Sequence, residues 1–357
     1  MSHELAALGW SPSRAEEFAP HAAAGCVPAR VAAQHRGAYL VYAESGERPA
    51  EIAGQLRHAA LGPADLPAVG DWVAVRDAPE AAAATIDAVL PRRTVFSRKA
   101  AGDETVEQVV AANVDVVFLV SALGPDLNLR RLERYLAAGW DSGADPVVVL
   151  NKSDLADDLA AETAEVKAVA FEVPVHVVSA ADGTGLDGLA RHVEGNRTAA
   201  LLGSSGVGKS SLVNRLLGSE RQDVAELRAD GRGRHTTTHR ELIPLPGGGL
   251  LLDTPGMREL GLWEADAGLD QTFADVAELA AGCRFRDCAH EGEPGCAVLD
   301  AVAEGRLAAE RLESYRKLRV EQAHQHRQQD QRAQLDEKRR AKASTRALTK
   351  RIKDKDR

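Results

Sequence analysis

The sequence predicts a multidomain α/β protein, in which a small N-terminal β-barrel precedes an α/β domain and a mostly helical C-terminal region. Three observations support this division. Short alternating apolar runs separated by turn residues extend from about Cys26 to Thr94, and continuous apolar runs that alternate with helical patterns follow them. Strand-like runs stop after about Leu262, and three of the four cysteines lie beyond that point.

The first 24 residues are expected to form an N-terminal extension with one short helix, and residues 25–97 to form the barrel. About five short strands in such a segment suit an OB-fold, a barrel that commonly binds nucleic acids. An SH3-like module or another small barrel has the same periodicity, so the pattern leaves these alternatives open. The strand-like runs are Ala29–Val31, Ala38–Tyr42, Asp71–Val75 and Thr85–Leu90.

Residues 98–265 have the pattern of an α/β domain. Val114–Val120 and Pro146–Leu150 are continuous apolar runs, which are typical of parallel strands buried on both faces. Between them, Asn128–Gly139 has the apolar spacing of a helix. Strands that alternate with helices indicate a sheet with helices packed against it. The other elements expected here are strands at Pro174–Val178 and Ala199–Leu202 and a helix at Ser210–Leu217.

A phosphate-binding loop is predicted between the strand Ala199–Leu202 and the helix that follows. Residues 203–210 read Gly-Ser-Ser-Gly-Val-Gly-Lys-Ser and fit the pattern G-x-x-x-x-G-K-[ST], in which backbone N–H groups and the helix dipole hold nucleotide phosphates. Lys209 is expected to neutralise the β- and γ-phosphates, and Ser210 to ligate Mg²⁺. A Gly- and Ser-rich turn before a helix is the alternative. The candidate phosphate-binding residues are Gly203, Ser204, Ser205, Gly206, Val207, Gly208, Lys209, Ser210 and Ser211.

The nucleotide base is expected to be guanine. Asn151, Lys152 and Asp154 lie in an Asn-Lys-Ser-Asp sequence directly after the strand Pro146–Leu150. The Asp154 carboxylate can accept hydrogen bonds from N1–H and the exocyclic amine of guanine, a pair of donors that adenine lacks. Asn151 would bond the other edge of the base and the loop, and the Lys152 stem would cover the face of the base. A polar turn that closes a strand is the alternative.

Two further segments complete the expected nucleotide site. Ser179 and Ala180 follow a strand and are expected to contact the guanine carbonyl through backbone N–H groups. Asp253 and Gly256 belong to an Asp-Thr-Pro-Gly sequence, whose carboxylate can hold Mg²⁺ through water and whose glycine amide can bond the γ-phosphate. In the run of three threonines between the phosphate loop and the Asp-Thr-Pro-Gly sequence, Thr237 is the expected Mg²⁺ ligand, and its neighbours Thr236 and Thr238 are the alternatives.

The order of these motifs is unusual. The guanine motif at residues 151–154 precedes the phosphate loop at residues 203–210, whereas the phosphate loop comes first in an ordinary GTPase. The sequence therefore predicts a circularly permuted P-loop GTPase domain.

Residues 266–318 are expected to form a mostly helical zinc domain, with helices at Thr272–Ala281 and Ala297–Leu318. Three cysteines and one histidine within it offer the donor set of a closed tetrahedral zinc site, so one structural zinc per chain is expected. Burial of small apolar thiols is the alternative. Cys26 is expected to be a core residue. The four candidate zinc ligands are Cys283, Cys288, His290 and Cys296.

The formal net charge of −9 conceals a segregation of charge along the chain. Residues 306–357 contain 17 Lys and Arg against 8 Asp and Glu, so this end is basic while the rest is acidic. The tail, residues 319–357, is expected to be helical or disordered and could lie along RNA phosphates. No apolar run approaches the roughly 18 residues of a spanning helix, and the N-terminus lacks a secretory pattern, so a cytoplasmic protein without membrane contact is expected.

With its motifs in this order, the sequence closely resembles the circularly permuted bacterial GTPases of the RsgA (YjeQ) family, which depend on the small ribosomal subunit. The resemblance extends from about Cys26 to Lys317 and includes Val69–Val73, Val89–Arg93 and Ala112–Asp115 as well as the motifs above. It implies an RNA-binding OB-fold, a permuted GTPase domain and a C-terminal zinc domain. It also implies binding to the 30S subunit and its 16S rRNA late in maturation, stimulation of GTP hydrolysis by the 30S subunit, and release on hydrolysis to GDP. A monomer is expected.

The residue that orients the hydrolytic water is the least determined part of this interpretation. GTPases that use a glutamine carry it after the Asp-x-x-Gly motif, where this chain has Met257. His235 adjoins the threonine run, and the family places a histidine there, so His235 joins Thr237 and Lys209 as a catalytic candidate. Glu259 is a weaker candidate for the same role, and a His235 that only packs or binds RNA is the alternative. The missing glutamine also leaves open a GTP-sensing rRNA-binding module in which hydrolysis is incidental, whereas the barrel, cysteine cluster and basic tail disfavour a metabolic or transport P-loop enzyme.

Overall fold

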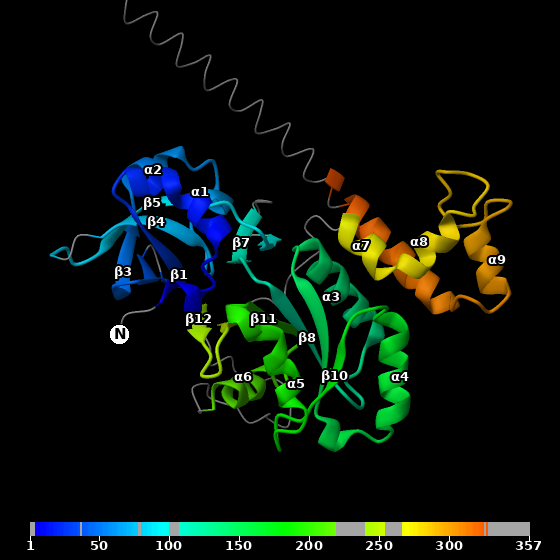
Figure 1. Ribbon diagram of the computed structural model, residues 1–357. Helices are drawn as coiled ribbons and strands as arrows, with labels where there is room; N and C mark the ends of the chain where they lie inside the picture. Colours follow the sequence, from blue (N-terminus) through cyan, green and yellow to red (C-terminus); the bar gives the residue numbers. More distant parts are fainter. Residues whose placement is uncertain are drawn as a thin grey trace, which may run out of the picture.

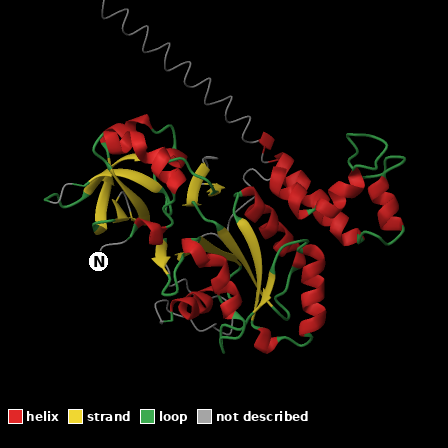
Figure 2. Cartoon of the chain, viewed as in Figure 1, coloured by secondary structure: helices red, strands yellow, loops and turns green. Residues whose placement is uncertain are grey.

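The computed structural model describes residues 4–35, 38–77, 80–99, 107–218, 240–253, 266–324 and 326–327. A β-barrel at one end, a central sheet flanked by helices and a helical region at the other end follow one another across the molecule (Figures 1 and 2). None of the helices in these ranges has the length and apolar content needed to cross a membrane.

The N-terminal segment packs against the barrel. It contains a 3-10 helix, Leu5–Leu8, and helix α1, Pro12–Ala23, which begins after Ser11, whose hydroxyl accepts a hydrogen bond from the Arg14 N–H. Leu8 and Phe18 are buried, and the Trp10 ring meets the Trp72 ring edge to face at 4.7 Å between centroids. The segment expected to be an extension therefore covers part of the hydrophobic core.

Five strands close into a barrel of the OB type. Their order is β1-β2-β3-β5-β4, and β1 also pairs with β4, which leaves no free edge. Strands β3 and β5 are parallel, and helix α2, Gly54–Ala59, lies between β3 and β4 in sequence. This closed barrel confirms the OB-like expectation. The strands are β1, Val27–His35; β2, Ala38–Ala43; β3, Gly46–Ile52; β4, Trp72–Arg76; and β5, Ala84–Val89.

The central sheet has the order β10-β9-β8-β11-β13-β12, and all neighbouring pairs are parallel except β12 with β13. Strand β12 also pairs with β1 of the barrel, where Ala33 lies opposite Glu241, so the hydrogen-bonded sheet continues from one domain into the other. The four strands predicted in this domain are confirmed within a few residues. The strands are β8, Val116–Ala122; β9, Asp145–Asn151; β10, Val175–Val177; β11, Thr198–Gly203; β12, Glu241–Pro244; and β13, Leu250–Asp253.

Helices cover both faces of the central sheet. Val117 and Leu119 of β8 share a buried cluster with residues of α3 and α4, whereas Phe118 and Val120 share a cluster with residues of α5 and α6. Alternate residues of one strand thus face opposite layers, which explains why the strand is apolar throughout. The helices are α3, Leu129–Asp141; α4, Leu159–Val169; α5, Leu186–Ala190; and α6, Lys209–Leu217.

A hairpin and a buried arginine join the barrel to the sheet. Strands β6, Val95–Lys99, and β7, Glu107–Ala112, pair antiparallel, so the domain boundary expected at residues 97 and 98 falls inside β6. The Arg30 guanidinium is buried and donates to the carbonyls of Leu8, Gly70 and Asn113. Burial lowers the Arg30 pKa to about 10, so the group remains a cation at neutral pH.

The C-terminal region is helical, with two interruptions. The helix predicted at Thr272–Ala281 is in fact two helices that meet at the non-helical, fully buried Phe273. The helix predicted at Ala297–Leu318 is also broken, because residues 304–308 form a turn in which Gly305 has a φ of 73°, and residues 309–324 then form another helix. The labelled helices here are α7, Asp266–Thr272; α8, Ala274–Ala280; and α9, Ala297–Ala303.

Arg311 ties this region to the GTPase domain. Its guanidinium donates to Glu133 of α3 at 2.6 Å, to the Thr272 carbonyl at 2.6 Å and to Asp275 of α8 at 3.0 Å. The Ser314 hydroxyl donates to the other Glu133 oxygen, and both ends of the Arg311–Glu133 pair are buried. A buried pair whose remaining hydrogen bonds are satisfied holds two elements in one arrangement, because breaking it leaves a charge without a partner.

Candidate functional site

The predicted nucleotide motifs meet at the carboxyl edge of the parallel strands. The Asn-Lys-Ser-Asp sequence begins at the last residue of β9, Ser179 lies two residues beyond β10, and the phosphate loop follows β11. Asp253 is the last residue of β13, which neighbours β11 in the sheet. Loops at this edge of an open α/β sheet commonly form ligand sites.

Asn151 connects two of these loops. Its side-chain N–H donates to the Val207 carbonyl in the phosphate loop at 2.8 Å, and its Oδ1 accepts from the Ala180 N–H at 3.0 Å. The Asn151 side chain is almost completely buried. One amide thus holds the phosphate loop and the Ser179–Ala180 loop at a set distance from each other.

Asp154 and Ser179 form a second contact between loops. The Ser179 hydroxyl donates to Asp154 Oδ1 at 2.7 Å, which orients the carboxylate. Lys152 adopts the left-handed conformation with a φ of 64°, and this turns the chain sharply between Asn151 and Asp154. The guanine candidates from β9 and β10 therefore lie in one place.

At Gly203 and Gly208 the phosphate loop leaves no room for a side chain. A Cβ at Gly203 would lie 2.4 Å from the Val120 carbonyl oxygen of β8. A Cβ at Gly208 would lie 2.3 Å from Asn151 Nδ2, and Gly208 has a φ of 93°. Any side chain at Gly208 would displace the amide that connects the two loops, so the glycine pattern and Asn151 depend on each other.

Lys209 points back across its own loop. Its ammonium group donates to the carbonyls of Gly203 at 2.7 Å and Ser204 at 2.6 Å. Helix α6 begins at Lys209, directly after Gly208 in the left-handed conformation. A cation and a helix N-terminus on one loop are the two features that favour a bound phosphate.

Several candidates lie outside the described residues. They include the catalytic candidate His235, the Mg²⁺ candidate Thr237, and Gly256 with the Met257 that follows it. Asp253 and Ser210 are described, and they stand at the end of β13 and in the first turn of α6.

Arg215 also supports this site, and no sequence motif includes it. This α6 residue donates from Nε to the Ala180 carbonyl at 2.9 Å, and also to the carbonyl of Ala181. It therefore binds the same loop as Asn151, through the loop carbonyls, whereas Asn151 accepts from the Ala180 N–H. An arginine near the end of an amphipathic helix carries no signal of this role, because the contact depends on how α6 packs beside that loop.

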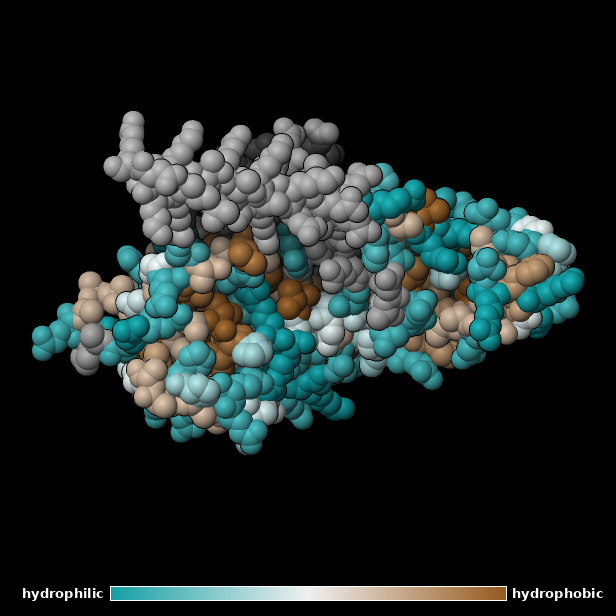
Figure 3. Space-filling model, turned by 90° about the horizontal axis from the view of Figure 1, so that it is seen from above, coloured by the Kyte–Doolittle hydropathy of each residue, from teal (hydrophilic) through white to brown (hydrophobic). Residues whose placement is uncertain are grey.

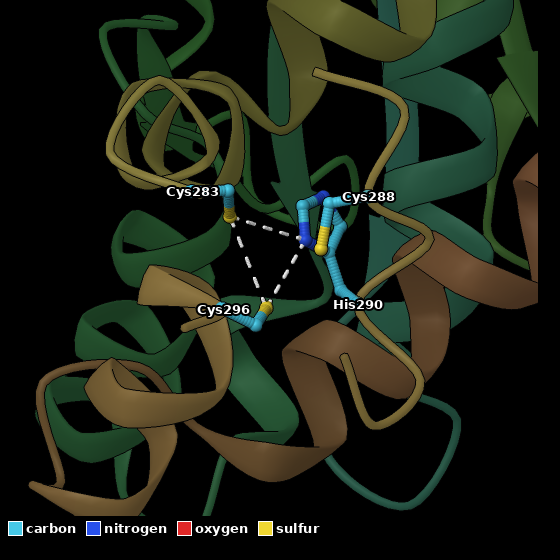
Figure 4. Close-up of side chains that lie close together, drawn as sticks. All are labelled: Cys283, Cys288, His290 and Cys296. Carbon is cyan, nitrogen blue, oxygen red and sulfur yellow. Dashed lines mark hydrogen bonds between the residues drawn. The ribbon is translucent and has the colours of Figure 1, made fainter. Parts of the chain in front are cut away.

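The four zinc candidates form one cluster. Their ligand atoms all lie within 4.8 Å of one another, and three of the side chains surround a common centre in Figure 4. The Sγ atoms of Cys283 and Cys296 are 3.9 Å apart, and His290 Nδ1 lies 3.6 Å from the first and 3.4 Å from the second. A tetrahedral zinc with Zn–S bonds of about 2.3 Å places two sulfurs about 3.8 Å apart, so these residues fit the ion.

The loop between His290 and Cys296 is held by a carboxylate. The backbone N–H groups of Gly292, Ala289 and Glu291 donate to Glu293, and these bonds lower the Glu293 pKa to about 2. Burial lowers the pKa of His290, which favours the neutral imidazole that a metal requires. The loop thus presents the His290 nitrogen to the thiols without a metal contact from Glu293.

Comparison with known proteins agrees with this architecture. A family model described as RsgA GTPase matches residues 89–263. The small ribosomal subunit biogenesis GTPase RsgA of Opitutus terrae is 52% identical over 336 residues, which cover 91% of this chain and 92% of that protein. The protein of the same name from Streptomyces coelicolor is 49% identical over 318 residues, covering 88% of this chain and 85% of the relative.

Solved structures show the same fold. YjeQ from Thermotoga maritima matches with a TM-score of 0.63 and 27% identity, over 84% of this chain and 99% of that one. YloQ, described as a circularly permuted GTPase, matches with a TM-score of 0.60 and 24% identity, over 84% of this chain and 96% of that one. The predicted architecture of an OB-like barrel, a permuted GTPase domain and a helical region with a Cys₃His cluster is therefore confirmed. The chain belongs to the RsgA family of GTPases.

Proposed function

We propose that this chain hydrolyses GTP to GDP and phosphate during late maturation of the small ribosomal subunit. In this proposal the 30S subunit stimulates hydrolysis, and the protein leaves the subunit once GTP has been hydrolysed. The observation that carries the proposal is the Asn151 contact, because the buried Asn151 amide joins the loop expected to read guanine to the expected phosphate loop by hydrogen bonds. The family membership and the names of the relatives support the ribosomal partner.

Guanine selection would come from the Asp154 carboxylate. Ser179 occupies one of its oxygens, and a carboxylate has lone pairs left to accept from N1–H and the exocyclic amine of guanine. The backbone N–H groups near Ala180 would serve the guanine carbonyl, and the Lys152 stem would cover the base.

Phosphate binding would use the loop and Lys209. A nucleotide phosphate is a stronger partner for the Lys209 ammonium than the Gly203 and Ser204 carbonyls, because a bond between two charged groups is stronger than one to a neutral carbonyl. Ser210 and Thr237 would ligate Mg²⁺, with Asp253 acting through water and the Gly256 N–H bonding the γ-phosphate. When it is bound, Mg²⁺ neutralises the charge that develops between the β- and γ-phosphates.

The hydrolytic water would be oriented by His235, because the chain has Met257 where a positioning glutamine would stand. A methionine thioether is too weak an acceptor to orient water. Slow hydrolysis in the free protein is therefore expected, with the 30S subunit completing the site. The same proposal includes contact of the barrel and the basic tail with 16S rRNA, a monomeric state and a cytoplasmic location. It also includes a single structural zinc at Cys283, Cys288, His290 and Cys296.

The GTPase rate with and without ribosomal subunits tests this function. Purified protein with GTP and Mg²⁺ is expected to turn over slowly alone and at least roughly tenfold faster with 30S subunits, as completion of other GTPase sites by a partner does. The large subunit alone is the control and is expected to give no stimulation. Equal rates with and without 30S subunits would instead favour a GTP-sensing rRNA-binding module in which hydrolysis is incidental.

Replacement of Asn151 by alanine tests the loop contact. It leaves the Ala180 N–H and the Val207 carbonyl without their partner, at a cost of about 1–3 kcal/mol for each group that stays buried. We expect GDP affinity to fall by about 10- to 100-fold in a fluorescence titration, because the two loops lose their spacing. Asn128→Ala is the matched control: it removes the α3 cap, which should lower stability by about 1 kcal/mol without a selective loss of GDP affinity. An equal loss of GDP affinity in both variants would contradict the assigned role of Asn151.

A further inference from the structure

The loop between the first two zinc candidates exposes an aromatic side chain between two cations. Four of the six phenylalanines are buried, whereas Phe285 is 42% exposed and Phe171 is 49% exposed. Phe285 stands between Arg284 and Arg286, which are both exposed, in the loop that joins Cys283 to Cys288. Exposure of a phenylalanine costs free energy, so its position among charged neighbours suggests a partner that uses the ring.

Backbone hydrogen bonds hold Arg284 and Phe285 in place within the cysteine-containing loop that joins α8 to α9. The Arg284 N–H donates to the Gly295 carbonyl at 3.0 Å, and the Cys288 N–H donates to the Phe285 carbonyl at 3.4 Å. A Cβ at Gly295 would lie 3.2 Å from the Arg284 Cβ, so the absence of a side chain there lets the Arg284 stem lie across the glycine. The Arg284 guanidinium lies 5.5 Å from the centre of the Phe285 ring. The ring and its cation are therefore positioned before any partner arrives.

The position of this loop leaves it accessible. It joins α8 to α9 and projects at the end of the molecule opposite the barrel (Figure 1). Seen from above, that end is covered mainly by hydrophilic residues with smaller hydrophobic areas among them (Figure 3). A small aromatic area with two cations suits a single flat ring better than the apolar face of a protein partner.

The side chains beside Phe285 indicate which kind of flat ring would bind to it. A nucleobase stacks on a phenylalanine face, while flanking arginines can pair with the phosphates on either side of that base. The exposed carboxylate of Asp287 in the same loop disfavours a long phosphate track and limits the contact to one or two nucleotides. A paired helix keeps its bases stacked inside, so only an unpaired base can reach the ring.

We infer that Phe285, with Arg284 and Arg286, is a stacking platform for an unpaired base of single-stranded RNA. The platform deepens the proposed function and rests on it, since the RNA would be an unpaired segment of ribosomal RNA. A zinc ion bound by Cys283 and Cys288 would hold both ends of the loop that presents the ring.

Binding of the full-length, zinc-loaded chain to a short fluorescent single-stranded oligoadenylate tests the platform. Phe285→Ala is expected to weaken binding about tenfold, and Phe285→Trp to retain or improve it, because the larger ring still stacks. Phe285→Leu keeps an apolar side chain without a π-face and should bind as poorly as the alanine variant. Phe171→Ala is the matched control, since Phe171 is similarly exposed but stands beside Glu172, and its affinity for the oligonucleotide should not change.

The arginines have a separate signature in salt titrations. Arg284→Ala and Arg286→Ala should each reduce the slope of log affinity against log salt concentration by about 0.7 for every lost phosphate contact on a single strand, whereas Phe285→Ala should leave the slope unchanged. A duplex RNA of the same length should bind the wild type and Phe285→Ala equally.

Several results would each overturn the inference. These are unchanged oligoadenylate binding in Phe285→Ala with its zinc retained, equal binding by the leucine and wild-type proteins, or an equal loss in Phe171→Ala. Loss of 30S binding by Phe285→Ala without loss of oligonucleotide binding would also overturn it, in favour of a ribosomal protein as the partner. Stimulation of GTP hydrolysis by 30S subunits in the wild type is measured separately, so the platform can fail while the proposed function stands.

Discussion

Replacement of Asp154 by asparagine is expected to weaken GTP binding by about 10²- to 10⁴-fold. The carboxylate is proposed to accept two hydrogen bonds from guanine, and bonds to a charged group contribute about 1.5–3 kcal/mol each. An asparagine presents an N–H group to one of those donors, and two donors repel each other. Xanthine has a carbonyl where guanine has the exocyclic amine, so the same N–H finds an acceptor there. Affinity for xanthosine triphosphate should therefore rise as affinity for GTP falls.

The structure allows this substitution without loss of the loop. The introduced asparagine would keep an oxygen that can accept from the Ser179 hydroxyl, which is 2.7 Å from the Asp154 carboxylate. Asp154 is exposed, so the change creates no cavity. We expect the thermal stability of the variant to equal that of the wild type, which separates base reading from folding.

Asp157→Asn is the matched control, because it makes the same chemical change on an exposed residue of the same loop. Competition of GTP and xanthosine triphosphate against a fluorescent nucleotide gives both affinities in one experiment. Unchanged GTP affinity in Asp154→Asn, or an equal loss in Asp157→Asn, would show that another residue selects the base.

The sequence predicted the central sheet well because local physical chemistry determines its strands. The runs Val116–Val120 and Val147–Leu150 are apolar throughout, since each strand packs against helices on both faces. The zinc candidates were found for a similar reason: their donor atoms lie close in sequence, and the loop between Cys283 and Cys296 brings them together.

Other elements depend on contacts that no local pattern contains. Strand β3, Gly46–Ile52, contains a proline and three charged residues, and it is a strand because β2 and β5 pair with its two edges. No pattern within residues 1–24 predicts that they pack on the barrel, because Trp72, the ring that Trp10 contacts, lies far away in sequence. In both cases the structure of the segment depends on residues far away in sequence that contact it, and not on the residues of the segment alone.

The side-chain hydrogen bonds that join the loops of the nucleotide site, and those that join α3 to the C-terminal region, also connect residues far apart in sequence. Asn151 was expected to bond the base and the loop, and its side chain also joins the Ala180 N–H to the Val207 carbonyl of the phosphate loop, 56 residues away in sequence. The Glu133–Arg311 pair joins residues 178 apart. Glu133 is a buried carboxylate among the buried residues of α3, and sequence alone favours neither its burial nor its partner.

Replacement of Cys283 and Cys288 by serine is expected to abolish zinc binding and unfold the region around α8 and α9. Binding of structural zinc contributes about 10–16 kcal/mol in small zinc domains, and here the three candidate cysteines lie in or against the buried cluster of the helical region. That cluster is small and includes two of the cysteines themselves, so the remaining apolar contacts are not expected to hold the loop. Metal analysis should give one zinc per wild-type chain and none in the double variant.

Cys26→Ser is the matched control, because Cys26 lies in the barrel and takes no part in the cluster. A serine hydroxyl there can donate to Asp87, which is 3.7 Å from the sulfur, so the barrel should tolerate it. This variant is expected to retain one zinc. Wild-type protein purified without chelator but free of zinc would contradict the metal assignment, as would a double variant that retains it.

Hydrogen exchange can locate the region that unfolds in the double variant. Contacts of α7 and Arg311 with α3 determine which helices should stay folded. Helix α7 packs so closely on α3 that a Cβ at Gly268 would lie 2.2 Å from the Ala137 carbonyl oxygen, and Arg311 binds Glu133 on the same helix. Neither contact requires the metal. Amides of α8 and α9 should therefore lose protection in the double variant, while those of α7 and of the central sheet keep it.

The nucleotide site should be spared for the same reason. Asn151, Asp154 and Lys209 belong to the central sheet and its loops. The side-chain hydrogen bonds of the zinc candidates join Cys283, His290 and Cys296 to one another and not to the sheet. GDP affinity of the double variant should therefore change by less than about threefold, which is less than 1 kcal/mol. A parallel loss of GDP affinity would instead mean that the metal supports the fold of the GTPase domain itself.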